Sequence, residues 1–330
     1  MPPKAPARTP AAMWTGTLFA LAAGLLWGLV FVAPLLLPQY PAALLSCARY
    51  LAFGVIALPL ALLDRPRMRS LTRADWLEAL KLSAVGNLLY YFCLAAAIQR
   101  AGGPLPTMII GTLPVVIAVT SNLRRSAVIR ARDGRLPWRR LAPSLILIAV
   151  GIALVNHSEW RTQGDGGDPW RFAAGAGLAV LAVACWTWYP IRNADWLRTH
   201  AGRSARAWAT AQGVATLPLA TVGMGLYWAW NHVTGSAFEM PLGPDPARFL
   251  GLMLAIGLLA SWVGTLCWNE ASQRLPPALA GQLIAFETLA ALTYAFLLRG
   301  QAPSAPTAAG IALLVAGVLW ALRVRPARLG

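Results

Sequence analysis

Long apolar stretches separated by short polar segments fill the 330-residue chain between residues 14 and 323. Each of ten such stretches is long enough to cross ~30 Å of hydrocarbon as an α-helix rising ~1.5 Å per residue. The pattern is typical of an all-α polytopic membrane protein with ten transmembrane helices. The predicted spans are 14–37, 42–63, 77–98, 104–123, 139–157, 170–191, 206–230, 248–270, 276–298 and 306–323.

The composition excludes an ordinary soluble domain. Hydrophobic residues make up 58% of the chain and charged residues only 12%, against roughly 25% charged residues in soluble proteins. The four cysteines fall singly in different apolar stretches, without a CxxC pair or a nearby histidine cluster. We therefore expect neither a disulfide framework nor a metal site.

The net charge of +16 is distributed unevenly between alternate loops. If the N-terminus is cytoplasmic, the inner segments hold 21 Lys and Arg residues and the outer segments hold 5. The positive-inside rule then places both termini in the cytoplasm. Since no aromatic-interleaved basic patch accompanies these charges, nucleic acid is not an expected partner.

The second half of the chain repeats features of the first half. A shift of 159 residues places Trp27 on Trp186, and the same shift aligns the glycine and proline pairs Gly16 and Gly175, Gly54 and Gly213, and Pro59 and Pro218. Later matches, such as Gly86 with Gly257, need a longer shift, which fits an insertion at 231–247.

Five spans per half is an odd number, so the two halves are predicted to enter the membrane in opposite directions. Inverted repeats are a hallmark of secondary transporters, with the substrate site near mid-depth between the repeats. The expected organisation is a disordered cytoplasmic tail (1–12), two five-helix repeats (13–157 and 170–323), an extracytoplasmic linker (158–169) and a C-terminal cytoplasmic tail (324–330).

Two charges inside predicted spans are candidate functional groups. Glu287 lies near the middle of the ninth span, where an ionised carboxylate costs roughly 2.5–3.5 kcal/mol on insertion scales. It is interpreted as a counter-charge for a substrate ammonium, a proton carrier or a fixed partner of a buried cation. Arg49, in the second span, could bind a substrate carboxylate, brace neighbouring carbonyls or pair with Glu287.

Aromatic and amide side chains complete the predicted site. Trp27 and Trp186 occupy equivalent positions in the two halves, and a pocket with large rings would suit an aromatic or bulky apolar ligand. Plain core packing is an equal alternative for the deep rings. The full set of predicted substrate-binding residues is Trp27, Arg49, Asn87, Tyr90, Tyr91, Trp186, Gln282 and Glu287.

Several motifs together resemble the drug/metabolite transporter superfamily, EamA type. They are the glycine-to-tryptophan spacing that opens each half, the second-span segment ALLSCARYLAFG with Arg49, and the Gly-rich tenth span AAGIALLVAGVLWAL. The aromatic-rich helices are similar to YddG-like exporters of aromatic amino acids. The resemblance implies a cavity surrounded by spans one to four and six to nine. The chain also departs from the family pattern. Its fourth span has the usual proline, Pro114, but the equivalent position of the ninth span is Glu287.

The predicted function is a secondary transporter that exports small amphipathic metabolites, most of all amino acids including aromatic ones. A multidrug or nucleotide-sugar-like carrier of the same fold is the alternative, and an intramembrane enzyme is a weaker one, since no HExxH or GxSxG motif is present. No catalytic residue, cofactor or metal is predicted. The expected partners are a small-molecule substrate and the lipid bilayer. We expect the protein to be a monomer and to lie in a bacterial inner membrane.

Overall fold

A computed structural model of the chain describes residues 10–101, 106, 109–123, 138–162, 169–200, 202–300 and 302–323, and these residues form helices without any strand. Shorter turns of other helical types interrupt three of the predicted spans. They are the 3-10 turn η1 (Leu29–Phe31) and the π-helical turns η2 (Ser83–Leu89) and η3 (Gly257–Val263). The α-helices are α1 (Pro10–Gly28), α2 (Val32–Leu36), α3 (Ala42–Leu63), α4 (Arg65–Arg69), α5 (Arg73–Leu82), α6 (Tyr90–Ala101), α8 (Leu113–Leu123), α10 (Trp138–Thr162), α11 (Pro169–Thr199), α12 (Ala205–Val233), α13 (Pro246–Ile256), α14 (Gly264–Arg274), α15 (Pro277–Leu283), α16 (Ala285–Arg299) and α17 (Ala305–Arg323).

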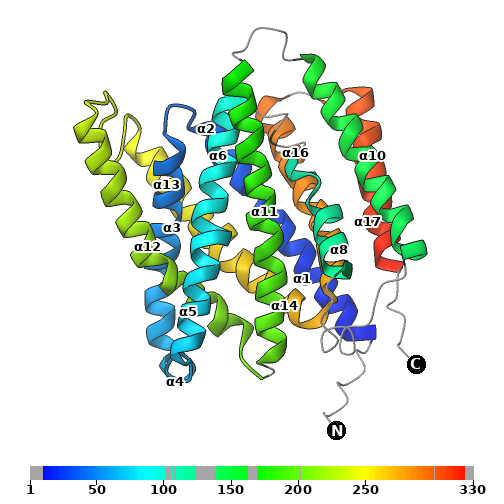
Figure 1. Cartoon of the computed structure of the whole chain (residues 1–330), viewed down its shortest axis with the longest axis horizontal. Helices are drawn as coiled ribbons and strands as arrows, with labels where there is room; N and C mark the ends of the chain where they lie inside the picture. The colour runs from blue at the N-terminus through cyan, green and yellow to red at the C-terminus, as the bar shows by residue number, and fades with distance from the viewer. Residues whose placement is uncertain are drawn as a thin grey trace.

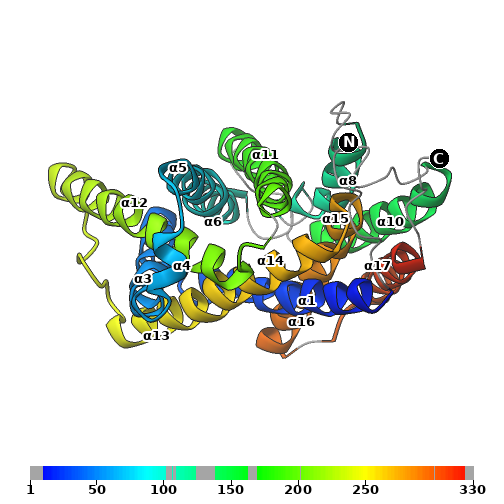
Figure 2. The same cartoon turned by 90° about the horizontal axis from the view of Figure 1, so that it is seen from below.

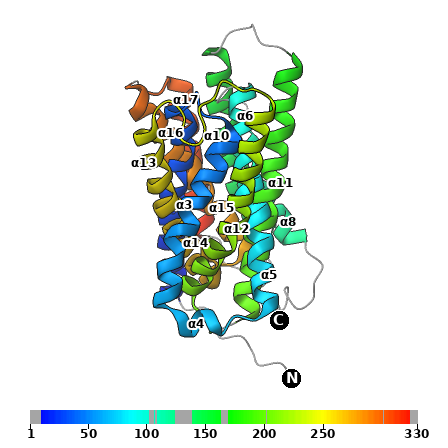
Figure 3. The same ribbon diagram turned by 90° about the vertical axis from the view of Figure 1, so that its left-hand side faces the viewer.

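The helices stand side by side as an upright bundle (Figures 1 and 3), which Figure 2 shows from below. Each predicted span contains helix, and six helical segments among the described residues are long and apolar enough to cross a membrane. The polytopic all-α class is therefore confirmed, whereas the count of ten crossings stays a prediction. α10 continues to Thr162, five residues into the predicted linker 158–169. The predicted tails 1–12 and 324–330 lie outside the described residues, apart from the first residues of α1.

Several described segments that carry arginines lie at one end of the bundle. α1 begins and α17 ends at the lower end in Figure 1, where α4 lies and where α11 and α14 end. The α4–α5 corner alone contributes Arg65, Arg67, Arg69 and Arg73. This common end is the one to which the charge pattern assigned the cytoplasm.

The ninth predicted span is broken, which the apolar pattern did not indicate. α15 ends at Leu283 and α16 begins at Ala285, with the Glu287 N–H donating to the Ile284 carbonyl across the junction. The fourth predicted span has a similar break, a turn at 111–112 just before α8. Glu287 and Pro114 therefore each stand in the first turn of a helix that starts inside the apolar layer.

The two π-helical turns lie in the third and eighth spans, η2 in one half and η3 in the other. A π-helical turn leaves backbone carbonyls exposed to side-chain donors, and such turns concentrate at functional sites. Ser46 of α3 donates to the Leu88 carbonyl in η2, and Trp27 of α1 donates to the Ala260 carbonyl in η3, both at 3.0 Å. Neither turn was predicted from the sequence, because apolar periodicity does not distinguish an α-turn from a π-turn.

Glycines allow close packing between helices that are far apart in the sequence. A Cβ at Gly213 of α12 would lie 2.5 Å from the Cβ of Ala57 on α3, and one at Gly54 of α3 would lie 2.6 Å from the Cβ of Leu217 on α12. In lipid there is no hydrophobic driving force between helices, so membrane helices associate through close van der Waals packing, which small residues of this kind allow. α3 and α12 are thereby held in direct contact.

Gly213→Ala is expected to destabilise the purified protein by about 1–3 kcal/mol, because the added methyl overpacks the contact with Ala57 and Phe53. Thermal unfolding in detergent measures the change. Gly225→Ala, on the same helix but with no atom within 4 Å of the added Cβ, is the matched control and should equal or exceed wild type. Equal unfolding of the two variants would contradict this account of the α3–α12 contact.

Candidate functional site

A small cavity lies at the centre of the bundle, where the interrupted helices meet. It leaves about 10 Å³ for solvent, roughly enough for one water molecule. Its walls come from six of the predicted spans, in both halves of the chain. The lining residues are Trp27, Val30, Arg49, Tyr50, Asn87, Tyr90, Trp186, Ala260, Ser261, Thr265 and Glu287.

Arg49 is held on the cavity wall by partial hydrogen bonding and by two rings. Its side chain is 4% exposed, and its Nε donates to Ser261 Oγ at 3.0 Å. The guanidinium carbon lies 4.8 Å from the ring centre of Tyr50 and 4.6 Å from that of Tyr91, within the range of cation–π attraction. Nη1 is buried without a hydrogen-bond partner, so one donor of Arg49 is available to a bound group.

Glu287 faces the same cavity from the first turn of α16. It is 4% exposed, and its Oε2 is buried without a hydrogen-bond partner. The start of a helix favours a negative charge by typically 0.3–1 kcal/mol. Gly24 of α1 permits this placement, since a Cβ there would lie 3.1 Å from the Glu287 backbone nitrogen.

The two charges share the cavity without forming an ion pair. No Arg49–Glu287 contact within 4.0 Å occurs among the described side chains, although both line the cavity. The structure therefore does not have the direct Arg49–Glu287 ion pair that the sequence left open as one alternative. Because a buried charge with an unmet hydrogen bond is costly, the pair is well suited to an added zwitterionic or polar partner.

Aromatic rings form a continuous stack along one side of the cavity. Trp27 meets Trp186 edge to face at 5.0 Å between ring centres. Trp186 is itself stacked between Tyr90 at 4.6 Å and Tyr189 at 4.9 Å. The Trp186 Nε1 and the Tyr90 hydroxyl are buried without partners, so these rings also offer polar atoms.

The structure brings six of the eight predicted site residues to the cavity wall, and leaves two outside it. Asn87 is at the wall, and its Nδ2 donates to Thr216 Oγ1 at 3.4 Å. Tyr91 lies behind Arg49 and donates to the Val30 carbonyl at 3.3 Å. Gln282 does not belong to the cavity: its Oε1 accepts from Ser144 of α10 at 3.1 Å. Gln282 therefore links α15 to α10 outside this cavity, while its Nε2 is buried without a partner, and its contact with substrate stays a prediction.

A network of buried amides lies close to the aromatic stack. Asn193 Oδ1 accepts from Trp208 Nε1 at 2.8 Å and from Gln212 Nε2 at 3.1 Å, while its Nδ2 donates to Asn269 Oδ1 at 2.8 Å. Gln212 Oε1 accepts from Tyr189, the ring that stacks on Trp186. The network thus joins α11, α12 and α14 to the cavity wall.

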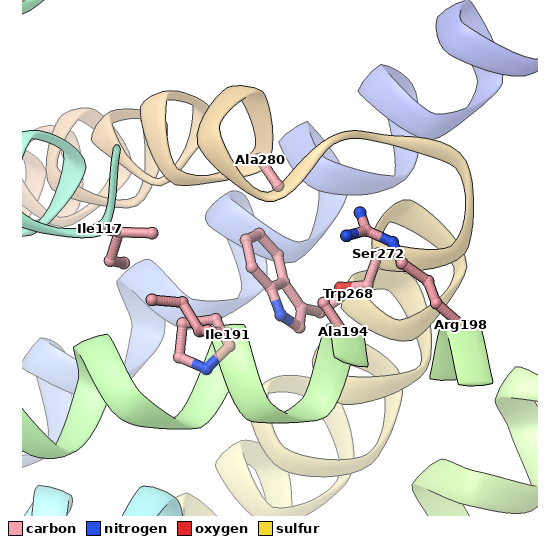
Figure 4. A pocket seen from close by; sticks show the side chains of 8 residues that line it. Ile117, Ile191, Ala194, Arg198, Trp268, Ser272 and Ala280 are labelled. Atoms are coloured by element: carbon pink, nitrogen blue, oxygen red, sulfur yellow. The ribbon is translucent and has the colours of Figure 1, made fainter. Parts of the chain in front are cut away.

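A second small cavity lies next to the first, between α11, α14 and α15 (Figure 4). Trp268 projects into it and lies 5.2 Å from Trp27 between ring centres, so this indole links the walls of the two cavities. Arg198 reaches the same region and donates to the Leu275 carbonyl. The space again amounts to about 10 Å³.

Sequence reasoning missed Tyr50, Ser261 and Thr265, which also line the central cavity. Tyr50 follows Arg49 directly, and sequence spacing alone places neighbouring helical residues on different faces. Ser261 lies in the π-helical turn η3, which shifts side chains away from the regular helical positions. The buried serine and threonine in an apolar span were the available signal.

Asn193→Leu is expected to destabilise the protein by about 1–3 kcal/mol for each buried partner left unsatisfied, because Trp208, Gln212 and Asn269 all bond to this one side chain. Chemical or thermal unfolding in detergent tests it. Gln273→Leu, which removes a single bond to the Arg203 carbonyl, is the control and should change stability less. A smaller effect of Asn193→Leu than of the control would overturn this assignment.

Comparisons with known proteins agree with the fold and the membrane character. Residues 14–133 match the EamA-like transporter family. The chain is 53% identical over 314 residues to the inner membrane protein YtfF of Escherichia coli (strain K12), covering 95% of this chain and 97% of that protein. A solved crystal structure, 17% identical, aligns with TM-score 0.69 over 93% of this chain and 96% of the other, a likeness in fold alone. On this sequence similarity, the chain belongs to the EamA-like transporter family.

Proposed function

We propose that the protein is a secondary carrier of small zwitterionic metabolites, most of all amino acids with bulky or aromatic side chains. One observation carries the proposal: Arg49 and Glu287 face a single buried cavity, and each has a polar atom without a partner. A carboxylate can bind to the guanidinium, and an ammonium to the carboxylate. The neighbouring Trp27 and Trp186 offer ring faces for an apolar side chain.

Reciprocal glycine contacts support two inverted repeats. Gly151 of α10 would meet Gly310 and Leu314 of α17, while Gly317 would meet Ser144 and Ile148 of α10. If Gly151 corresponds to Gly317, these two sets of contacts are the same set made twice. Under this correspondence Gly310 matches Ser144, which precedes Gly151 by seven positions. Each glycine thus contacts a position of the other helix that is offset by seven residues, about 10 Å along the helix. If a twofold axis related two parallel helices, each residue would lie at the same level as its own equivalent. The seven-residue offset does not fit that arrangement and supports antiparallel repeats.

The interrupted spans support a substrate site at mid-depth. Carriers with inverted repeats commonly bind substrate where helices are broken at corresponding positions of the two halves. Here the breaks precede α8 in the first half and α16 in the second. Glu287 stands at the second break and faces the central cavity.

The closed cavity supports alternating access as the mechanism. Space for about one water cannot hold an amino acid, so binding requires the surrounding helices to separate. We propose that one half rocks against the other, opening the cavity first to one side and then to the other. The name of the relative YtfF supports an inner-membrane location, and the arginines of the α4–α5 corner, at the end of the bundle where α1 begins, support cytoplasmic termini.

Glu287→Gln is expected to lower the rate of amino acid exchange by about tenfold or more, because hydrogen bonds to charged groups contribute ~1.5–3 kcal/mol. Counterflow of radiolabelled phenylalanine and leucine in proteoliposomes of the purified protein measures it. Glu239→Gln, in the exposed loop before α13, removes the same charge and should leave exchange unchanged. Unaltered transport of every amino acid by Glu287→Gln would refute the proposed pose.

Trp186→Leu is expected to raise the KM for phenylalanine and tryptophan by about three- to tenfold relative to leucine, since an aromatic pair contributes ~0.5–1.5 kcal/mol beyond burial. Competition between these amino acids for counterflow gives the ratio. Trp230→Leu, at an exposed position of α12, serves as the control. An equal loss for all three amino acids would assign Trp186 to packing alone.

A carrier of cationic amphiphiles is the second candidate, favoured by the acid and rings at the cavity. It predicts that lipophilic ammonium compounds, rather than amino acids, compete for counterflow and depend on Glu287. Trans-stimulated exchange of either class would also separate a carrier from a channel, which gives none.

A further inference from the structure

A third cavity lies where the α4–α5 corner of the first half meets the α11–α12 corner of the second. It holds about 160 Å³, against a share of ~30 Å³ for each water in the liquid. A phosphate group with part of a glycerol fits this space. Its lining residues are Arg67, Ser70, Leu71, Trp196, Gly202, Arg203, Ser204, Ala207 and Trp208.

Two guanidinium groups supply donors at this cavity. Arg203 donates to Ser70, and its Nη2 lies 3.8 Å from Asp75 Oδ2. Arg67 Nη1 lies 3.3 Å from Asp64 Oδ2. Each guanidinium carries five N–H donors, and these contacts use only part of them. Both therefore keep hydrogen-bonding capacity for an anion.

Asp75, the carboxylate paired with Arg203, is also hydrogen-bonded to other groups of the protein. Asp75 is 3% exposed, and its Oδ2 accepts from the backbone N–H and the hydroxyl of Thr72. Its Oδ1 accepts from Trp196 Nε1 at 3.1 Å. These bonds satisfy Asp75 within the protein, so the cavity itself presents mainly donors. α12 begins at its wall with Ser204, and the positive end of that helix adds to the potential.

The cavity lies at the level where several apolar helices end. The candidate spans Ala42–Leu63, Arg73–Ala101 and Trp170–Thr199 all have an end beside it. The flanking segments 64–73 and 198–206 together carry seven arginines and one aspartate. Basic pockets between membrane helices at the cytoplasmic surface bind anionic lipid headgroups, and a span end is the depth at which headgroups lie.

From this geometry we infer that the α4–α12 cavity binds the phosphate of an anionic phospholipid headgroup, with Arg67 and Arg203 as its ligands. Exposed leucines favour a lipid over a soluble phosphate. Leu63 ends α3 one residue before Asp64 and is 77% exposed, and Leu77 on α5 is 56% exposed. Such exposed apolar side chains on the helices that adjoin the α4–α5 corner give acyl chains a surface to cover.

The site joins the two halves of the chain. Arg67 belongs to the first half and Arg203 to the second, and the Arg203–Ser70 bond crosses between them. A headgroup bound by both arginines would strengthen this crossing. The inference does not depend on which solute the central cavity carries, because no lining residue is shared with that cavity.

The test measures thermal unfolding of the full-length purified protein in detergent, with phosphatidylglycerol, with phosphatidylcholine, or with glycerol 3-phosphate. We expect phosphatidylglycerol to raise the unfolding midpoint by at least ~2 °C over phosphatidylcholine, as a ligand of the folded state does. Arg67→Gln should abolish this difference. Arg65→Gln and Arg69→Gln, exposed on the same short helix but outside the cavity, remove the same charge and should keep it.

Arg203→Gln is the second variant and should also abolish the difference between the two lipids. If Arg203→Gln does not fold, the result for Arg67→Gln alone tests the site. Loss of the lipid effect to the same degree in the control variants would overturn the site, since it would indicate diffuse charge attraction. A full shift with glycerol 3-phosphate and none added by phosphatidylglycerol would overturn the lipid as the source. Absence of any phosphate-dependent shift in wild type would overturn the inference altogether.

Discussion

The burial of two opposite charges in an almost dry centre is the constraint on which the rest of the structure depends. Taking Arg49 and Glu287 out of water is unfavourable unless each is supported. Arg49 is supported by Ser261 and by the rings of Tyr50 and Tyr91, and Glu287 by the start of α16. Neither support is complete, because one atom of each charge lacks a partner. The centre therefore keeps unmet hydrogen-bonding capacity on both charges.

Interrupted helices make this arrangement possible in a membrane. An unbroken ninth span would place Glu287 on a helix side without a helix start nearby. The junction at Ile284 supplies that start, and the π-helical turns η2 and η3 open carbonyls to Ser46 and Trp27. Irregular backbone at mid-depth is tolerated where it is buried in protein or lines a cavity. Here it lies at the wall of the central cavity, where neighbouring side chains satisfy it.

Much of the fold could be predicted from the sequence, because long apolar stretches have few structural solutions in a bilayer. The helical class followed from hydropathy, and the repeat singled out Trp27 and Trp186, although not their direct contact. Mid-span charges similarly indicated Arg49 and Glu287 as cavity residues. The breaks, the π-turns and the place of Gln282 could not be predicted, since they depend on contacts between helices. Gln282 shows this most clearly: its partner, Ser144, lies 138 positions away in the sequence.

The small size of the central cavity affects whether protons can leak across the membrane down their electrochemical gradient. With space for about one water, the cavity between Arg49 and Glu287 is too small to hold a file of water molecules along which protons could pass. Trp268 packs against Trp27 on the wall of this cavity and also lines the neighbouring cavity, which is equally small. In this closed state, the central cavity therefore does not itself provide a proton leak across the electrochemical gradient of the membrane.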